Sequence, residues 1–330
     1  LFLPDYTTLA IHKLMLGDGV RVAAYREAIA KTVQGKTVLD LGAGTGILAL
    51  FAAKAGARKV IAIERTAIAR AARRLVIQNG LEDRIEVIED DSRNVTLPEK
   101  VDVIVSEWMG VHVFQENMLA SVIDARDRFL KPGGTMIPEL VELWIAPLTR
   151  NPVWESEFES WRTPITDIRM DTVSDLSLND TYIAKVDPAD LGHPGLRVHA
   201  LNAHTCKSSS EFSMSAVFRV AHNQTVAGVC GWFTVELCDG VSFDTGPSSP
   251  VTHWQQVVYS CDPPVTVRAG DLLTLGVTAL PGKDRTHFDW WVGAGEQRRE
   301  FSTRRNYLLP GSDVMQRPQP RASERRRRER

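Results

Sequence analysis

The sequence predicts an α/β domain built on a parallel sheet, followed by a mostly antiparallel β domain. Residues 36–130 alternate between apolar runs and helical stretches, which is the pattern of a parallel sheet with crossover helices. After Pro138 the long helical patterns end, and short β-rich runs separated by turn clusters replace them. We therefore expect a first domain over residues 1–138, a second over 139–312 and a tail over 313–330.

The first domain should hold five strands and the helices that connect them. The expected strands are Thr37–Leu41, Lys59–Glu64, Ile85–Ile88, Val101–Ser106 and a last one that ends near Pro138. The expected helices are Gly46–Ala55, Ala67–Asn79 and residues 115–130. Asn79-Gly80 is a helix stop, and Pro132-Gly133-Gly134 is a turn that leads into the last strand.

The second domain should be a barrel or a sandwich. Its β-rich runs are Glu142–Leu148, Ser213–Arg219, Gly231–Leu237, Gln255–Cys261 and Leu272–Leu280. Turn clusters such as Asp239-Gly240, Gly246-Pro247 and Asp262-Pro263-Pro264 separate them. Residues 155–185 are polar and irregular, which predicts a protruding arm.

Composition restricts the classes of protein that remain. The 330 residues are 43% hydrophobic and 24% charged, with a net charge of -2, so no global charge favours nucleic acid or a membrane surface. No apolar run approaches the roughly 20 residues that span a bilayer. Four cysteines without a Cys-x-x-Cys spacing predict no metal site and no disulfide framework, and favour a reducing cytoplasm.

The tail is strongly basic. Residues 321–330 hold six arginines and follow a proline-rich stretch. Such a segment is a solvated, disordered tail or a basic arm for an acidic partner. No aromatic residues are interleaved with the arginines, so nothing here identifies that partner.

A glycine-rich turn after the first strand indicates a cofactor site. Asp40 and Leu41 end the strand, and Gly42-Ala43-Gly44-Thr45-Gly46 follows before a helix, so the backbone can approach a ligand at a helix N-terminus. A dinucleotide site would carry a further glycine where Ile47 stands. The spacing instead favours a nucleoside-type methyl donor, with Glu64 at the end of the second strand accepting hydrogen bonds from two ribose hydroxyls.

Two glutamates near the end of the fourth strand are the candidate chemical groups. Glu107 follows that strand, and Glu116 comes nine residues later. Ligands of open α/β sheets bind at the carboxyl ends of strands, so a loop over 110–115 can bring Glu116 opposite Glu107. Two carboxylates that face one pocket match the forked N–H donors of a guanidinium and can orient a nitrogen lone pair for transfer.

Several motifs together resemble the protein arginine N-methyltransferase family. Ser106-Glu107-Trp108-Met109-Gly110 followed by Glu116-Asn117-Met118-Leu119 is similar to its double-glutamate loop. Thr252-His253-Trp254 is similar to the loop that closes its substrate pocket from the β-barrel side. Tyr6, His12, Met15 and Arg21 have the spacing of its N-terminal helix, which folds over the cofactor. The similarity runs colinearly from about residue 2 to 310.

The resemblance implies a Rossmann-like class I methyltransferase domain, a β-barrel domain and a dimerisation arm. It implies S-adenosylmethionine as cofactor, S-adenosylhomocysteine as product, and a homodimer formed through residues 155–185. Arg21 would pair with the cofactor's carboxylate, Asp18 would pair with His253, and Glu107 and Glu116 would hold the substrate. The cofactor pocket would be formed by Arg21, Asp40, Gly42, Gly44, Glu64, Asp91 and Ser92. The substrate pocket would be formed by Tyr6, Met15, Trp108, Met109, Val111, Gln115, Met118 and Trp254.

Departures from the family's sequence pattern leave more than one hypothesis for the identity of the substrate. Val111 and Gln115 stand where the family carries a tyrosine and an aromatic residue, and Arg93 stands near the adenine where it carries a glutamate. One hypothesis is methylation of a peptide arginine. The other is methylation of a small nitrogenous aromatic metabolite such as an indole, with one glutamate as general base. A third, a catalytically silent scaffold, is disfavoured by the intact glycine loop and both glutamates.

Overall fold

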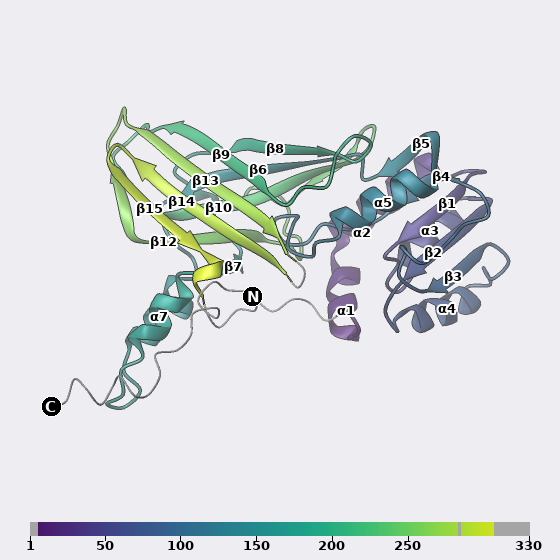
Figure 1. Ribbon diagram of the computed structural model, residues 1–330, viewed down its shortest axis with the longest axis horizontal. Helices are drawn as coiled ribbons and strands as arrows, with labels where there is room; N and C mark the ends of the chain where they lie inside the picture. The colour runs from purple at the N-terminus through teal and green to yellow at the C-terminus, as the bar shows by residue number, and fades with distance from the viewer. Residues whose placement is uncertain (1–5, 283–284, 307–330) are drawn as a thin grey trace, which may run out of the picture.

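The computed structural model describes residues 6–282 and 285–306, and the predicted basic tail over 313–330 lies outside the described residues. An α/β domain and a β domain lie side by side, with α2 (Gly19–Thr32) between them (Figure 1). α2 packs against α3 on one side and against β10 and β11 on the other. Among the described residues, no helix combines the length and apolar character needed to cross a membrane.

The α/β domain is a parallel sheet with strand order β3-β2-β1-β4-β5. Its strands are β1 (Thr37–Leu41), β2 (Lys59–Glu64), β3 (Ile85–Glu89), β4 (Val101–Val105) and β5 (Leu130–Ile137). Besides α2, its helices are α1 (Leu9–Gly17), α3 (Ile47–Lys54), α4 (Ala69–Gln78) and α5 (Leu119–Phe129).

The predicted parallel sheet is confirmed, and its order places the site. All five residues of β1 are buried, because a central parallel strand is covered on both faces by helices. β1 pairs with β2 on one side and with β4 on the other, so the direction of strand succession reverses at β1. Ligands of such sheets bind at the carboxyl ends of the strands at this reversal.

The β domain consists of two antiparallel sheets that share one hydrophobic core. The larger sheet runs β7-β12-β10-β6-β8, with β11 added beside β10, and the smaller runs β15-β14-β13-β9. The strands of the larger sheet are β6 (Leu140–Leu148), β7 (Thr181–Ala184), β8 (Leu196–Asn202), β10 (Gln224–Cys238), β11 (Val241–Asp244) and β12 (Gln256–Val267). Those of the smaller are β9 (Phe212–Arg219), β13 (Leu272–Pro281), β14 (Thr286–Ala294) and β15 (Gln297–Ser302). Two short 3-10 turns, η2 (Pro188–Asp190) and η3 (Thr303–Arg305), complete this domain.

Two boundaries predicted from the sequence, one strand end and one helix start, are wrong. Asp262-Pro263-Pro264 does not end a strand but lies inside β12. There Val265 pairs with Val226 while Ser260 pairs with Gly228, so the extra residues form a local irregularity within one long strand. The helix predicted from residue 115 begins only at Leu119, because residues 111–118 form the loop that carries Glu116.

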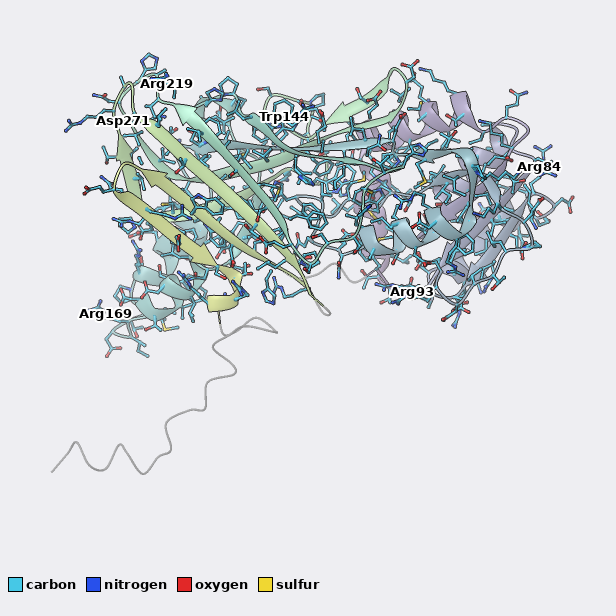
Figure 2. All side chains as sticks on the ribbon, turned by 45° about the horizontal axis from the view of Figure 1, so that its top comes forward. Arg84, Arg93, Trp144, Arg169, Arg219 and Asp271 are labelled. Carbon is cyan, nitrogen blue, oxygen red and sulfur yellow. The ribbon has the colours of Figure 1, made fainter. Side chains whose placement is uncertain are left out.

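The predicted arm protrudes from the β domain, and it is more helical than its composition indicates. It contains a π-helical turn η1 (Glu155–Glu159), α6 (Ser160–Arg162) and α7 (Asp171–Ser177), and β7 leads back into the larger sheet. Figures 1 and 2 show the arm projecting away from both sheets, with Arg169 on it. Ile165 and Ile168 are 59% and 60% exposed, so the arm presents apolar surface.

Candidate active site

One cavity opens at the carboxyl ends of β1, β2 and β4, and residues of α1 and α2 also line it. It brings together most of the side chains that the sequence selects. The predicted residues that line it are Tyr6, Met15, Arg21, Gly42, Gly44, Glu64, Asp91, Ser92, Glu107, Glu116 and Met118. Thus the cofactor loop, both glutamates and the N-terminal segment face the same space.

The glycine loop and Glu64 form one hydrogen-bonded unit. Gly44 has φ +55°, and a Cβ atom there would lie 3.1 Å from Cε1 of His12, so glycine suits both the backbone and the space. The amide of Gly44 donates to Oε2 of Glu64 at 2.9 Å, and that of Thr66 donates to Oε1 at 2.8 Å. Each carboxylate oxygen can accept a further hydrogen bond from a hydroxyl in the cavity.

Asp40 lies beneath the loop, outside the cavity wall. Its Oδ2 accepts a hydrogen bond from the amide of Ala49 in α3 at 2.9 Å, while Oδ1 has no partner among the described residues. Burial, with a smaller contribution from the charge of Glu64, raises the pKa of Asp40 to about 7. Asp40 therefore joins the end of β1 to the start of α3.

Arg21 and Asp18 hold the N-terminal helices over the site. Asp18 caps α2 by accepting from the amide of Arg21 at 3.0 Å, and its Oδ2 accepts from the amide and Nδ1 of His253 at 2.9 and 2.8 Å. Burial opposes ionisation, but these hydrogen bonds outweigh it and hold the pKa of Asp18 below its usual range. The Arg21 guanidinium donates to the carbonyl of Met15 at 2.9 Å, and its Nε lies 3.3 Å from Oε2 of Glu107.

The two glutamates occupy different electrostatic environments. Glu107 accepts from the amide of Met109 at 3.1 Å and contacts the Arg21 cation. Glu116 hydrogen-bonds with the side chain of Tyr6, and burial together with the nearby charge of Glu107 raises the pKa of Glu116 to about 7. A Cβ on Gly110 would lie 2.7 Å from Cγ of Glu116, so the loop closes tightly enough to require glycine. Such a pair can bind a cation and accept a proton.

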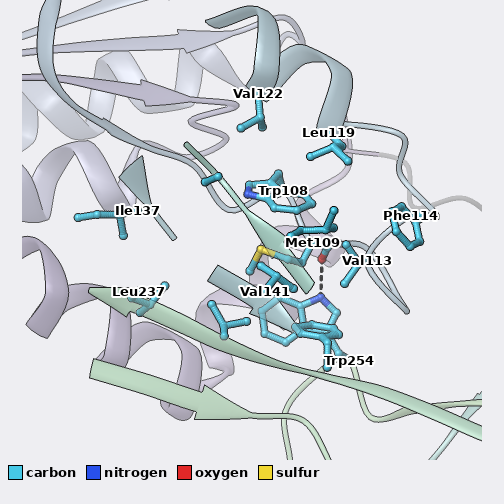
Figure 3. Close-up of a cluster of buried hydrophobic side chains, with 14 of the residues drawn as sticks. Trp108, Met109, Val113, Phe114, Leu119, Val122, Ile137, Val141, Leu237 and Trp254 are labelled. Atoms are coloured by element: carbon cyan, nitrogen blue, oxygen red, sulfur yellow. Dashed lines mark hydrogen bonds between the residues drawn. The ribbon is translucent and has the colours of Figure 1, made fainter. Parts of the chain in front are cut away.

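Five predicted substrate-pocket residues are not among those that line this cavity. Figure 3 shows Trp108, Met109 and Trp254 in a buried apolar cluster, where the indole Nε1 of Trp254 donates to the carbonyl of Met109 at 2.7 Å. Trp108, Met109 and Trp254 are at most 3% exposed, and they join the loop to the β domain. Gln115 is buried and Val111 half-buried beside the same core.

Asp91 lines the cavity with its carboxylate already paired. Arg93 donates to both of its oxygens, at 2.8 and 2.6 Å, and this guanidinium lowers the pKa of Asp91 to about 2. The departure at Arg93 thus creates a partner for Asp91. Sequence reasoning missed Asp90 and Thr66 in the wall, although both follow the ends of strands that the sequence predicts. His12, which the sequence places in the N-terminal motif, also lines the cavity. The lining residues that were given no role from the sequence are Leu16, Leu41, Ala43, Thr45, Ile47, Leu48, Ile63, Arg65 and Ser121.

The cavity fits an adenosyl group that carries an amino acid. The glycines of the turn let its backbone approach a ligand closely, Glu64 offers acceptors for hydroxyls, and the Arg21 cation lies next to Glu107. A family model described as a methyltransferase domain matches residues 38–134, which contain the glycine loop and Glu64. The fold and the cavity therefore define an S-adenosylmethionine-dependent methyltransferase.

Comparisons with known proteins give the family. The arginine methyltransferase oligomerization subdomain matches residues 141–291. Protein arginine N-methyltransferase 6 of Danio rerio is 34% identical over 93% of this chain and 94% of its own length, and that of Xenopus laevis is 33% identical over 89% and 92%. The chain belongs to the protein arginine methyltransferase family.

Solved structures agree over nearly the whole chain. The PRMT1 enzyme-prozyme heterotetrameric complex of Trypanosoma brucei with AdoHcy has a TM-score of 0.82 at 30% identity, covering 91% of this chain and 99% of that one. Protein arginine methyltransferase 10 of Arabidopsis thaliana has a TM-score of 0.78 at 31% identity, covering 90% and 99%. S-adenosylmethionine is accordingly the cofactor.

Proposed function

We propose that this protein transfers a methyl group from S-adenosylmethionine to an arginine guanidinium held between Glu107 and Glu116. The observation that carries the proposal is that both carboxylates line the cofactor cavity. Glu107 already contacts one guanidinium, that of Arg21, so this environment suits such a cation. The relatives named protein arginine N-methyltransferase support the same substrate class.

The residues would divide the work between binding, orientation and proton transfer. The bound cofactor supplies an electrophilic methyl group. Arg21 pairs with its carboxylate, and Glu64 accepts from its ribose hydroxyls. Asp91 and Ser92 line the cavity beside Arg93, and we assign this part of the cavity to the adenine ring. Glu107 and Glu116 accept N–H groups of the substrate and aim one nitrogen at the methyl group. The carboxylate of Glu116 has the raised pKa of a group able to take up the released proton.

Asp18 and His253 would act by positioning. Their hydrogen bonds connect the start of α2 to the loop that precedes β12, and therefore connect Arg21 to the β domain. Tyr6 hydrogen-bonds with Glu116, and Met15 and Met118 supply apolar wall. Trp108, Met109 and Trp254 support the loop from beneath.

A small aromatic substrate is the second candidate. The sequence favours it at Val111 and Gln115, where the family carries aromatic residues. Without those rings, the pocket would have room for an aromatic ring of the substrate. Neither residue is among those that line the cavity, so their substitution gives no support to a larger pocket. Arginine is therefore the substrate class that we propose.

Single substitutions of the two glutamates test the proposal. Glu107→Gln and Glu116→Gln should each lower kcat/KM for an arginine peptide by about a hundredfold or more, because each leaves a buried cation with one charged partner. S-adenosylmethionine affinity, measured by calorimetry, should change little in Glu116→Gln. Glu82→Gln, at an exposed position of the same domain, is the control. Wild-type rates in both glutamate variants would exclude the mechanism, and loss in only one would favour a neutral aromatic substrate.

We also propose a domain boundary at residue 138 and a homodimer formed through the arm over 155–185. β5 ends at Ile137 in the parallel sheet, and β6 begins at Leu140 in the antiparallel one. The match to an oligomerization subdomain and the exposed Ile165 and Ile168 support assembly through this part of the chain.

A further inference from the structure

His112 lies between Glu107 and Glu116 in the chain, and its side chain contacts the β domain. It is 1% exposed, and its Nδ1 lies 2.7 Å from the hydroxyl of Tyr259 in β12. The two rings meet edge to face, with centroids 5.6 Å apart. Nothing in the proposed chemistry uses His112, although the loop that carries it also carries Glu116.

The segment around His112 is a tight turn whose closure sets the position of Glu116. Gly110 and Val113 form a β-bridge, with the amide of Val113 donating to the carbonyl of Gly110 at 2.8 Å. Glu116 packs directly onto Gly110, where no Cβ would fit. A shift of this turn would therefore move Glu116 relative to Glu107.

Hydrogen bonds attach the loop to the β domain along its length. Trp254 donates to the carbonyl of Met109 at 2.7 Å, and Thr286 donates to the carbonyl of Phe114 at 2.6 Å. Both use loop backbone, which any residue would supply. The bond between His112 and Tyr259 instead depends on the identity of both side chains and lies at the tip of the turn.

Placing His112 there has a cost. Its Nε2 has no hydrogen-bond partner among the described residues, and burial lowers the pKa of His112 to about 3, so the ring is neutral at pH 7. His112 and Val113 both have positive φ, at +48° and +68°, which is unfavourable for side chains of this size. Gly231 leaves room for the ring, since a Cβ there would lie 2.9 Å from Nε2. Such a conformation persists only where the surroundings determine it.

We propose that His112 is a positioning residue, which fixes the loop between Glu107 and Glu116 against β12 through the hydroxyl of Tyr259. This inference rests on the proposed role of the two glutamates. The contact makes the geometry of the carboxylate pair depend on the β domain, although both glutamates belong to the α/β domain. Its loss should reduce the rate of transfer while the cofactor still binds.

Tyr259→Phe is the primary test, because it removes only the hydroxyl and keeps the packed ring. We expect kcat for an arginine peptide to fall about tenfold, with a smaller change in KM and unchanged S-adenosylmethionine affinity by calorimetry. His112→Ala should lower kcat at least as much, and adding Tyr259→Phe to it should have no further effect. His112→Asn should recover most of the rate, because its amide places a polar atom near the position of Nδ1 and asparagine tolerates positive φ.

Ser260→Ala is the matched control. Ser260 follows Tyr259 on β12 and is equally buried, and its hydroxyl accepts a hydrogen bond from Asn151 at 2.9 Å rather than bonding the loop. Successive side chains of a strand point to opposite faces of the sheet. This variant should lose a comparable amount of thermal stability and retain wild-type kcat. If Ser260→Ala and Tyr259→Phe lower kcat equally, the effect is one of stability and the inference is overturned.

Glu116→Gln separates failure of the inference from failure of the proposed function. If it is inactive while Tyr259→Phe and His112→Ala keep kcat within about twofold of wild type, the positioning role is wrong and the glutamate mechanism stands. If Glu116→Gln keeps its activity, the proposed function is wrong and the inference fails with it. Should His112→Ala not fold, Tyr259→Phe and His112→Asn decide the matter alone.

Discussion

Burial and the charge of Glu107 raise the pKa of Glu116 to about 7 in the cofactor-free and substrate-free protein, so the ionised fraction of this carboxyl grows as pH rises through about 7. Tyr6, Glu107 and Arg21 are the charged or titratable groups that act on it. A guanidinium requires the ionised carboxylate, so kcat/KM for an arginine peptide should rise with pH through about 7. Rate measurements between about pH 6 and pH 9 check this, and Glu116→Gln should remove the rise. A profile that is identical in wild type and variant would contradict it.

The raised pKa values of Glu116 and Asp40 make the stability of the fold decrease as pH rises, whereas the activity should increase. The pKa values of Glu116 and Asp40 are both raised to about 7 in the folded protein, so the folded state binds more protons than the unfolded state between the usual carboxyl pKa and 7. The stability that this difference contributes is fully present at low pH and is lost as pH rises through about 7. Asp40→Asn should weaken this dependence in cofactor-free protein without altering the pH profile of kcat/KM.

Glu64 provides a separate test of the cofactor site. Its carboxylate accepts from the amides of Gly44 and Thr66, so Glu64→Ala removes both the proposed ribose contacts and the brace of the glycine loop. Two hydrogen bonds to a charged acceptor contribute about 1.5–3 kcal/mol each, so S-adenosylmethionine affinity should fall at least about tenfold. Calorimetry measures it, with circular dichroism to verify the fold. Unchanged affinity would exclude Glu64 from the site.

At the scale of elements, Asp18 joins three segments: α1, α2 and the loop that precedes β12. Asp18→Ala removes the cap of α2 and both hydrogen bonds to His253, so unfolding in urea should show a loss of about 1–2 kcal/mol or more. His253→Ala keeps the cap and the bond from the His253 amide, and should cost less stability. Both variants should slow methyl transfer, because the segment that carries Arg21 is held less firmly against the β domain. Equal stability of wild type and Asp18→Ala would contradict the capping role.

The elements that the sequence predicted best are those with buried, periodic apolar residues. β1 and β2 begin and end where expected, since each contains five consecutive buried residues, the pattern of a strand that is covered on both faces. That the strand continues through Asp262-Pro263-Pro264 could not be foreseen, because pairing with β10 both before and after these residues holds it in the sheet. The positions of Trp108 and Trp254 depend on contacts between the domains, which no local pattern encodes.

At the scale of the whole molecule, the site depends on both domains. The cofactor cavity is formed by the N-terminal segment and the α/β domain. The loop between the glutamates, however, is tied to the β domain through Trp254, Tyr259 and Thr286. Substitutions at the domain interface should therefore affect transfer more than cofactor binding.

The proposed homodimer would cover apolar side chains that are exposed in the single chain. Ile165 and Ile168 are 59% and 60% exposed on the arm, and α1 exposes Leu9 and Leu14 at 71% and 54%, so a second copy could cover apolar groups at both places. We expect wild-type protein to sediment as a dimer at micromolar concentration, and the double variant Ile165→Asp/Ile168→Asp to sediment as a monomer, because two buried carboxylates would oppose docking. Val217→Asp, at an equally exposed position of β9 outside the arm, is the control and should remain dimeric.

Dimerisation should also strengthen cofactor binding. Met15 and Leu16 of α1 line the cavity, so docking of the arm near α1 would stabilise the helix that covers the cofactor, and the monomeric variant should bind S-adenosylmethionine more weakly. A wild-type monomer, or a double variant that still forms dimers, would show that the arm has another role.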